Sequence, residues 1–254
     1  MKFKIEDQDP GVKTLYKFLK NQKLKNPSYR VLDVGGAMAP FFWEFTDTIL
    51  DWNDPASSNT WIDYKKLGIK EVDFKGKFLQ GDITNDSGWN ELLEEVKVNG
   101  KYDFSICRHT IEDIDNPQLV VQKLPEVSKN GFIAVPSKYW EMEKGIYPAM
   151  PQTRGFHHHR WIFITKNRRL YGLPKMGWTD SISDKDLKKM KNKLFQKRIN
   201  LELNMYWENS IDVIFLSSSI HSVPENYGDE FVRKFIDNEQ YPWSAWINLL
   251  INSD

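Results

Sequence analysis

The chain has 254 residues, enough for one large domain with a substantial core. Its 35 basic and 35 acidic residues cancel, so no overall charge draws it toward nucleic acid or an anionic membrane surface. The single cysteine cannot form an internal disulfide, no apolar run reaches the roughly 18 residues of a membrane span, and no secretory leader is recognisable. We therefore expect a cytoplasmic protein.

Strands and helices alternate through the first half of the chain. A helix is predicted from Pro10 to about Asn26, because apolar residues recur there every three or four positions. Five strands are predicted, at YRVLDV, TDTILDW, KFLQGDI, YDFSIC and GFIAVPS. A second helix follows the third strand, capped by Asp86 or Ser87, and a third begins at Asn116 and its neighbouring proline. This alternation predicts a mostly parallel sheet covered on both faces.

The pattern changes after Ser137. A hairpin is predicted in WIFITKNRRLYGLPK, with its turn at Lys166 and Asn167. An amphipathic helix with a lysine-rich outer face follows over residues 184–198. NLELNMYWENSIDVIFLSS predicts two strands that form an antiparallel pair at one side of the sheet, and FVRKFIDNEQYPWSAWINLLI is predicted to be helical on either side of its proline.

The stretch RVLDVGGAMAPFF joins a strand to a turn of very small residues. Gly35, Gly36 and Ala37 would allow a ligand to approach the backbone closely. Asp51, eighteen positions after Asp33, ends the second strand, where an acid can accept hydrogen bonds from ribose hydroxyls. The alternatives are a simple tight turn and a solvated loop acid. Neither GxGxxG nor GK[ST] is present, so the turn does not indicate a phosphate-binding loop.

Two more segments place polar groups at strand ends. In GDITND, the Asp82 carboxylate can accept from an adenine amino group while the backbone N–H of Ile83 serves a ring nitrogen; an aspartate that only caps a turn is the alternative. In RHTIEDIDNP, His109 and Glu112 follow the fourth strand, three residues apart.

The order and spacing of these motifs from Tyr29 to about Ser137, a little under half of the chain, resemble class I S-adenosylmethionine-dependent methyltransferases of the type 11 group. The resemblance implies an α/β Rossmann-like fold, with a mostly parallel sheet and an antiparallel strand pair near the C-terminus. It also implies in-line methyl transfer to an unidentified small-molecule acceptor, with S-adenosyl-L-methionine as cofactor and S-adenosyl-L-homocysteine as product. We expect one methyltransferase domain over residues 1–254, in which residues 138–200 form a substrate-facing insertion.

Carried over residue by residue, the resemblance implies three groups of site residues. The expected cofactor-binding residues are Asp33, Gly35, Gly36, Ala37, Asp51, Trp52, Asp82, Ile83, Arg108 and His109. The expected substrate-binding residues are Glu112, Glu141, Arg160 and Trp161. The expected catalytic bases are His109 and the run in RGFHHHRWIF, His157, His158 and His159.

Imidazole titrates near neutral pH, which suits a base, but the histidine run could instead hold its loop by hydrogen bonds. Adjacent residues on an extended segment point to opposite faces, and neither CxxC nor HExxH accompanies the run. We therefore expect no metal.

Other functions remain open. Ala37 and Ala39 in the glycine turn, and Asp113 after the glutamate, depart from the family pattern and would fit a binding or scaffold protein without turnover. The basic helix over residues 184–198 would fit a nucleic-acid methyltransferase, although a solvated helix face explains its lysines more simply. A dinucleotide-dependent oxidoreductase ranks last, because it lacks the GDI and His-Thr-Ile-Glu segments. No membrane partner is expected, and the sequence specifies neither acceptor nor oligomeric state.

Overall fold

The computed structural model describes residues 10–37, 42–54, 74–146, 153–166, 169–175 and 202–216. The helices predicted over residues 184–198 and near the C-terminus lie outside these ranges, as does Ala39. The chain divides into two compact units: unit 1 comprises Met1–Val135 and Asn204–Ile211, and unit 2 comprises Pro136–Leu203 and Asp212–Asp254. The single domain and its insertion at residues 138–200 stay predictions. Within the described ranges, no helix is long and apolar enough to cross a membrane.

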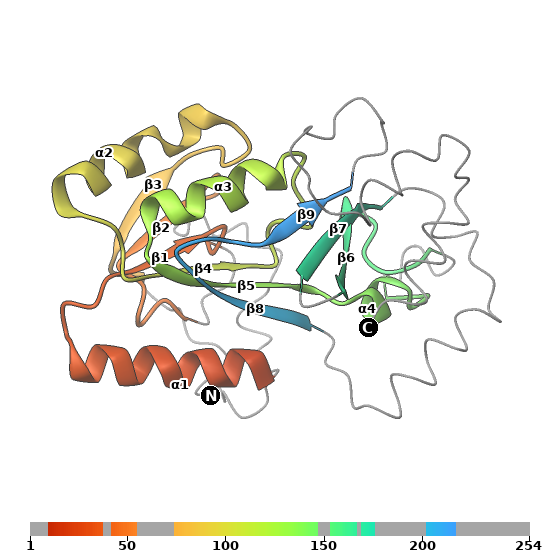
Figure 1. Cartoon of the computed structure of the whole chain (residues 1–254), viewed down its shortest axis with the longest axis horizontal. Coiled ribbons are helices and arrows are strands. Elements are labelled where there is room, and N and C mark those ends of the chain that lie inside the picture. Colours follow the sequence, from red (N-terminus) through yellow and green to blue (C-terminus); the bar gives the residue numbers. More distant parts are fainter. Residues whose placement is uncertain are drawn as a thin grey trace. The chain divides into compact units, whose positions relative to one another are not determined.

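Unit 1 is built around a six-stranded sheet with the order β3-β2-β1-β4-β5-β8 (Figure 1). Its strands are β1 Val31–Val34, β2 Thr48–Asp51, β3 Lys77–Gln80, β4 Phe104–Arg108, β5 Asn130–Pro136 and β8 Glu202–Glu208. The first five of these strands pair in parallel. The strand order reverses between β1 and β4, and ligands bind at the carboxyl ends of the strands at such a switch point. The predicted α/β Rossmann-like fold is confirmed.

β8 runs antiparallel to β5. Asn209 N, just after β8, donates to Lys129 O at 2.9 Å, just before β5. Tyr206 lies three positions before Asn209, and Phe132 lies three positions after Lys129. The rings of Tyr206 and Phe132 pack together, with their centroids 4.9 Å apart. The contacts advance along one strand as they recede along the other, which defines an antiparallel pair.

Unit 2 has a three-stranded sheet with the order β6-β7-β9. The two strands of the predicted hairpin are confirmed: β6 (Trp161–Lys166) pairs antiparallel with β7 (Arg169–Pro174). Of the predicted turn, Lys166 belongs to β6 and Asn167 lies outside the described residues. β9 (Val213–Phe215) runs parallel to β7. The pairing predicted between the last two strands is therefore not observed, because β8 joins one sheet and β9 the other. Alternating apolar residues locate both strands but do not specify the partner of either one.

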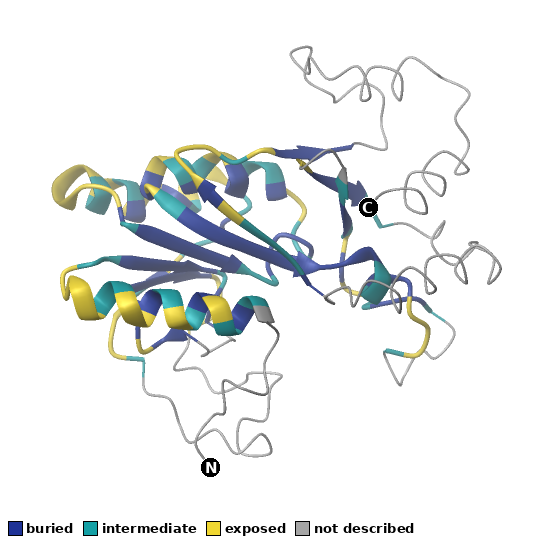
Figure 2. Ribbon diagram, turned by 60° about the horizontal axis from the view of Figure 1, so that its bottom comes forward, coloured by how far each residue is buried: buried dark blue, intermediate teal, exposed yellow. Residues whose placement is uncertain are grey.

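Helices lie on both faces of the sheet of unit 1 (Figures 1 and 2). α1 (Pro10–Lys25) lies on one face, and α2 (Asn90–Asn99) and α3 (Pro117–Val127) lie on the other. Beneath α1, buried apolar residues of the helix and of β1, β4, β5 and the turn before β2 form one cluster: Val12, Leu15, Leu19, Val31, Phe42, Phe45, Phe104, Ile106, Phe132 and Ala134.

The helix starts follow simple capping chemistry. Asn116 caps α3 by accepting a backbone N–H of its first turn, which confirms the predicted Asn-Pro start. Before α2, the 3-10 turn Asp86–Trp89 is capped by Asn85 rather than by Asp86 or Ser87. The predicted cap was misplaced because the 3-10 turn begins ahead of the α-helix.

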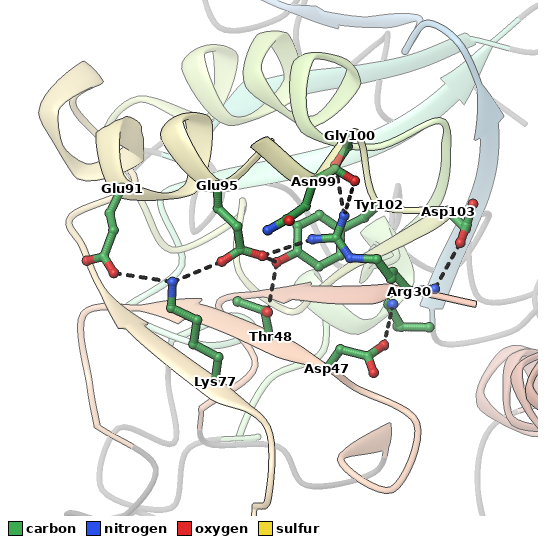
Figure 3. A network of polar contacts seen from close by, with 11 residues as sticks. Arg30, Asp47, Thr48, Lys77, Glu91, Glu95, Asn99, Gly100, Tyr102 and Asp103 are labelled. Carbon is green, nitrogen blue, oxygen red and sulfur yellow. Dashed lines mark hydrogen bonds and ion pairs between the residues drawn. The ribbon is translucent and has the colours of Figure 1, made fainter. Parts of the chain in front are cut away.

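A polar network joins the strands at the amino edge of the sheet (Figure 3). The guanidinium of Arg30 donates to Glu95 at 2.9 Å and lies 4.1 Å from the ring centre of Tyr102. The Tyr102 hydroxyl is hydrogen-bonded to Thr48 Oγ1 at 2.8 Å and to Glu95, to which Lys77 also donates at 2.9 Å. Burial raises the pKa of Glu95, but the hydrogen bonds from Tyr102 and Lys77 outweigh it and hold the pKa below its usual value. The network thus links β2, β3 and α2 to the chain that enters β1 and β4.

Tyr102→Phe is expected to lower the free energy of unfolding by about 1–2 kcal/mol, because Glu95 and Thr48 lose a buried hydrogen-bond partner. Urea unfolding followed by tryptophan fluorescence measures the change. Tyr206→Phe is the matched control, because Tyr206 is 50% exposed, and it should change the value by less than about 0.5 kcal/mol. Equal losses in the two variants would contradict the stabilising role of the network.

Candidate functional site

The turn after β1 lies at the carboxyl edge of the sheet, beside the switch point. Gly35 N donates to Leu50 O at 2.9 Å, and its φ of 79° is a conformation that favours glycine. A Cβ on Gly35 would lie 2.4 Å from Thr110, and one on Gly36 would lie 2.1 Å from the carboxyl carbon of Asp33. The glycines therefore allow the turn to pack directly against Asp33 and the loop after β4. The space that a Cβ would need at Gly35 and Gly36 is already filled by the side chains of Thr110 and Asp33.

Asp51 holds the same turn from the end of β2. Its Oδ2 accepts from Ala37 N at 3.0 Å, and its Oδ1 accepts from Asn53 N at 2.8 Å. Burial raises the pKa of Asp51, and these backbone hydrogen bonds partly oppose the shift. Each carboxylate oxygen can accept a second hydrogen bond. The side chain is 8% exposed, whereas that of the next residue, Trp52, is 66% exposed.

Buried acids gather around the end of β4. Asp33 is 3% exposed, and burial together with the charge of Asp51 raises its pKa to about 8, while Arg108 opposes the shift. Burial also raises the pKa of the Cys107 thiol, and the charges of Glu112, Asp33 and Asp51 add to the increase. Three buried carboxyl groups are therefore close enough to act on one thiol. Such a cluster disfavours anionic ligands and favours cationic ones.

The loop after β4 brings His109 and Glu112 together. His109 Nδ1 lies 3.0 Å from Glu112 Oε1. The Glu112 side chain is fully buried, and that of His109 is 26% exposed. The structure therefore places Glu112, a predicted substrate-binding residue, against His109 instead of at the surface.

The GDITND turn after β3 satisfies its own hydrogen bonds. Asp82 Oδ1 accepts from Thr84 N at 2.9 Å and from Thr84 Oγ1 at 2.6 Å, and Oδ2 accepts from Asn85 Nδ2 at 2.8 Å. These bonds lower the pKa of Asp82, those from Thr84 most. Ile83 is buried, and its carbonyl accepts from Trp89 Nε1 at 3.1 Å. The turn-capping alternative describes Asp82 in this structure, and the adenine contact stays a prediction.

In unit 2, His159 belongs to a buried cluster. Its Nδ1 lies 2.6 Å from Glu141 Oε1, and Glu141 Oε2 accepts from Lys175 Nζ at 2.6 Å. Lys175 also donates to Phe156 O at 2.6 Å. Glu141 is 1% exposed and His159 is 8% exposed, so the contact between them is withdrawn from water. The hydrogen bond of His159 fits the alternative prediction that the histidine run holds its loop. Its partner is Glu141, a predicted substrate-binding residue.

The other predicted residues of unit 2 lie nearer its surface. His157 and His158 are exposed, and their rings meet edge-on with centroids 5.4 Å apart. Burial lowers the pKa of His158, with His159 and His157 adding to the shift. Arg160 is exposed, and Trp161, at the start of β6, is partly buried.

Unit 1 thus gathers the predicted residues of the glycine turn, Asp51 and His109 at one edge of its sheet, whereas Glu141 and His159 meet inside unit 2. Sequence reasoning missed Thr110, which packs on Gly35, and Lys175, which binds Glu141. Thr110 lies inside the His-Thr-Ile-Glu segment and could have been included. Lys175 belongs to no recognisable motif.

No protein-family model and no curated protein matches the chain. Similar solved structures include an S-adenosylmethionine-dependent methyltransferase from Clostridium acetobutylicum, at 15% identity and a TM-score of 0.34 over 54% of this chain and 55% of that one. The methyltransferase domain of bacterial CtHen1-C matches at 16% identity and a TM-score of 0.35, over 54% of this chain and 72% of that one. The glycopeptide N-methyltransferase MtfA, solved with S-adenosyl-L-homocysteine, matches at 11% identity and a TM-score of 0.32, over 63% of this chain and 59% of that one. The chain thus spans just over half of the first protein, and similarity this low does not assign it to a family.

We expect Asp33→Asn to stabilise the ligand-free protein at neutral pH. Between the usual pKa of 3.8 and the folded value of about 8, the folded state keeps a proton that the unfolded chain has released. Stability therefore falls as pH rises through this window. Asparagine removes the loss, which we expect to be on the order of 4 kcal/mol at pH 7.

Thermal unfolding of this variant between about pH 5 and pH 8 tests the expectation, with a flatter pH dependence as its signature. Asp86→Asn, at an exposed aspartate, is the control and should leave the pH profile unchanged. An Asp33→Asn protein less stable than the wild type at pH 7 would contradict the assigned pKa.

Glu141→Gln is expected to destabilise unit 2 by about 3 kcal/mol or more, because it leaves the buried Lys175 ammonium without its carboxylate. Hydrogen exchange followed by mass spectrometry should show faster exchange in residues 153–160. Adding Lys175→Met should restore part of the protection, and Glu143→Gln, at an exposed glutamate, should have no effect. Unchanged exchange in Glu141→Gln would show that the cluster does not hold the loop.

Proposed function

We propose that this chain is an S-adenosylmethionine-dependent methyltransferase whose cofactor binds at the carboxyl edge of the sheet of unit 1. The observation that carries the proposal is the group of buried carboxyls at the switch point, Asp33, Asp51 and Glu112. In their ionised form these carboxyl groups would repel the phosphates of a dinucleotide and attract the positively charged sulfonium and ammonium groups of the methyl donor. Charge thus distinguishes the methyl donor from other ligands that bind at such switch points.

The residues at this edge fit the cofactor in chemistry. Asp51 would bind the ribose hydroxyls, because its backbone hydrogen bonds use only part of the accepting capacity of the carboxylate. Trp52, which is 66% exposed, offers an aromatic face for the adenine, with Asp82 and Ile83 as the proposed polar contacts.

The methionine end would lie by the glycine turn. The residues proposed for it are Asp33, Gly35, Gly36, Ala37 and Arg108. Asp33, whose pKa is about 8, holds a proton in the free protein near pH 7 and would release it to a cationic ligand.

The chemistry divides between cofactor and protein. When bound, the cofactor supplies an activated methyl: the acceptor lone pair bonds to the methyl carbon, and the pair of the broken carbon–sulfur bond stays on sulfur in S-adenosyl-L-homocysteine. The chain's own residues hold the two reactants in line and exclude water. His109 is the proposed base for an acceptor that must lose a proton, with His157, His158 and His159 as the other candidates.

A small molecule is the proposed acceptor. Its proposed contacts are Arg160, which is exposed, and Trp161, which is partly exposed. We propose no acceptor contact for Glu112 or Glu141, because both are fully or almost fully buried against histidines.

Calorimetric titration with S-adenosyl-L-methionine and S-adenosyl-L-homocysteine tests the proposal. We expect micromolar binding, which Asp51→Asn weakens tenfold or more, about 1.4 kcal/mol. Because the homocysteine product lacks the sulfonium charge, we expect it to bind more weakly than the methyl donor at this acidic edge. Folded wild-type protein that gives no heat with either ligand would overturn the proposal.

Two controls sharpen this titration. Asp86→Asn, at an exposed site after β3, should bind like the wild type. Near pH 7 the binding heat of the wild type should depend on the ionisation enthalpy of the buffer, because Asp33 releases a proton, and Asp33→Asn should lose this dependence.

A further inference from the structure

His109 adopts a left-handed backbone conformation that is uncommon outside glycine, although asparagine, aspartate and histidine adopt it more often than other residues. Its φ is 50°, yet its N–H still donates to Ala134 O at 2.9 Å, directly after the point where Arg108 pairs with Ala134 in the parallel register. The strand pairing therefore continues up to His109 and fixes the position of the turn. Strained conformations of this kind persist where the surrounding structure imposes them, and they cluster at functional sites.

Glu112 is fully buried, and burying a carboxyl group costs free energy of folding. Its side chain is 0% exposed, Oε1 contacts His109 Nδ1 at 3.0 Å, and Oε2 is buried with no hydrogen-bond partner within the described ranges. A buried polar atom without a partner requires an explanation, because an apolar side chain of similar size would be more stable. The two unusual features of this loop, the backbone of His109 and the carboxylate of Glu112, meet in one contact.

We infer that Glu112 is a positioning residue that fixes His109 as the tautomer with its proton on Nδ1, leaving Nε2 as the nitrogen that accepts a proton. In its carboxylate form Glu112 can only accept hydrogen bonds, and the ring nitrogen of His109 that faces it is then the donor. The neutral imidazole then has its lone pair on the other nitrogen.

This inference rests on the proposed function for its chemical meaning. In methyl transfer, the acceptor's proton passes to His109 Nε2, and the electron pair of that broken bond stays on the acceptor atom that bonds to the methyl carbon. The Glu112 carboxylate holds the ring in place and stabilises the imidazolium that forms. Glu112 touches neither cofactor nor acceptor in this arrangement and acts only through His109.

The tautomer of His109 can be measured in the ligand-free, full-length protein. With ¹⁵N-labelled histidine, long-range proton–nitrogen spectra separate ring nitrogens that carry a proton from those with a lone pair. The chain has five histidines, and His109→Asn identifies the signals of His109 by their loss. Above its titration range, the wild type should show a proton on Nδ1 and a bare Nε2. The opposite tautomer would overturn the inference without recourse to any Glu112 variant.

Glu112→Gln then tests the link between the two residues. The amide can either accept or donate, so we expect a mixture of His109 tautomers in place of one. Glu44→Gln, the same change at an exposed glutamate, should leave the spectrum as in the wild type. An unchanged single tautomer in Glu112→Gln would overturn the inference. Should that variant not fold, Glu112→Asp retains the carboxylate and should retain the tautomer, and loss of the tautomer there would also count against it.

Activity gives a second reading once an acceptor is identified. Glu112→Gln should lower kcat by about tenfold to a hundredfold with little change in the KM of the acceptor, because the base is misoriented while binding is preserved. A rise in KM with unchanged kcat would overturn the positioning role. The spectra need no cofactor, so a protein that has the expected tautomer but gives no calorimetric signal supports the inference and overturns the proposed function instead.

Discussion

The structure depends on carboxyl groups that are held out of water where the strands of a parallel sheet end. Asp33 and Asp51 lie on adjacent strands, and Glu112 follows the next strand across the switch point. Burial and the charge of Asp51 raise the pKa of Asp33 to about 8, which is energy that the fold must offset elsewhere. The glycine turn belongs to the same arrangement, because only residues without a Cβ let the backbone pack on Asp33 and on the loop that carries Glu112.

The opposite edge of the sheet offers the contrast. There Glu95 is also partly buried, but Arg30 and Lys77 meet it, and its pKa lies below the usual value instead of above it. One sheet thus has an edge where acids are paired with cations and an edge where acids crowd together. The first pattern is what stability alone favours, and the second persists where function requires a destabilised site. This difference, more than the fold, points to the carboxyl edge as the site.

Much of this architecture could be predicted from the sequence, because strands and helices have distinct apolar periods and because Asn116 and its proline mark a helix start. Pairing could not be predicted in the same way: β8 and β9 have the expected alternation but join different sheets. For the candidate site residues, the sequence predicts positions at strand ends but not the orientation of the side chains. The three-residue spacing of His109 and Glu112 can be read from the sequence, but the complete burial of Glu112 depends on how the loop packs. Lys175 carries no local signal, because its partner Glu141 is 34 positions away.

Both units contain a histidine whose Nδ1 meets a buried glutamate, and the difference between the two pairs decides which is the better base. In unit 2, the Glu141 carboxylate is shared between His159 and Lys175, so part of its charge is already neutralised by the ammonium. In unit 1, Glu112 meets His109 through one oxygen while the other has no partner among the described residues. A carboxylate that is not shared with a lysine stabilises an imidazolium more strongly, because its full charge acts on the ring. His159 is also 8% exposed, whereas the side chain of His109 is 26% exposed and stands at the end of β4 beside the buried acids. His109 is therefore the stronger candidate for proton transfer, and the cluster in unit 2 is the stronger candidate for holding its loop.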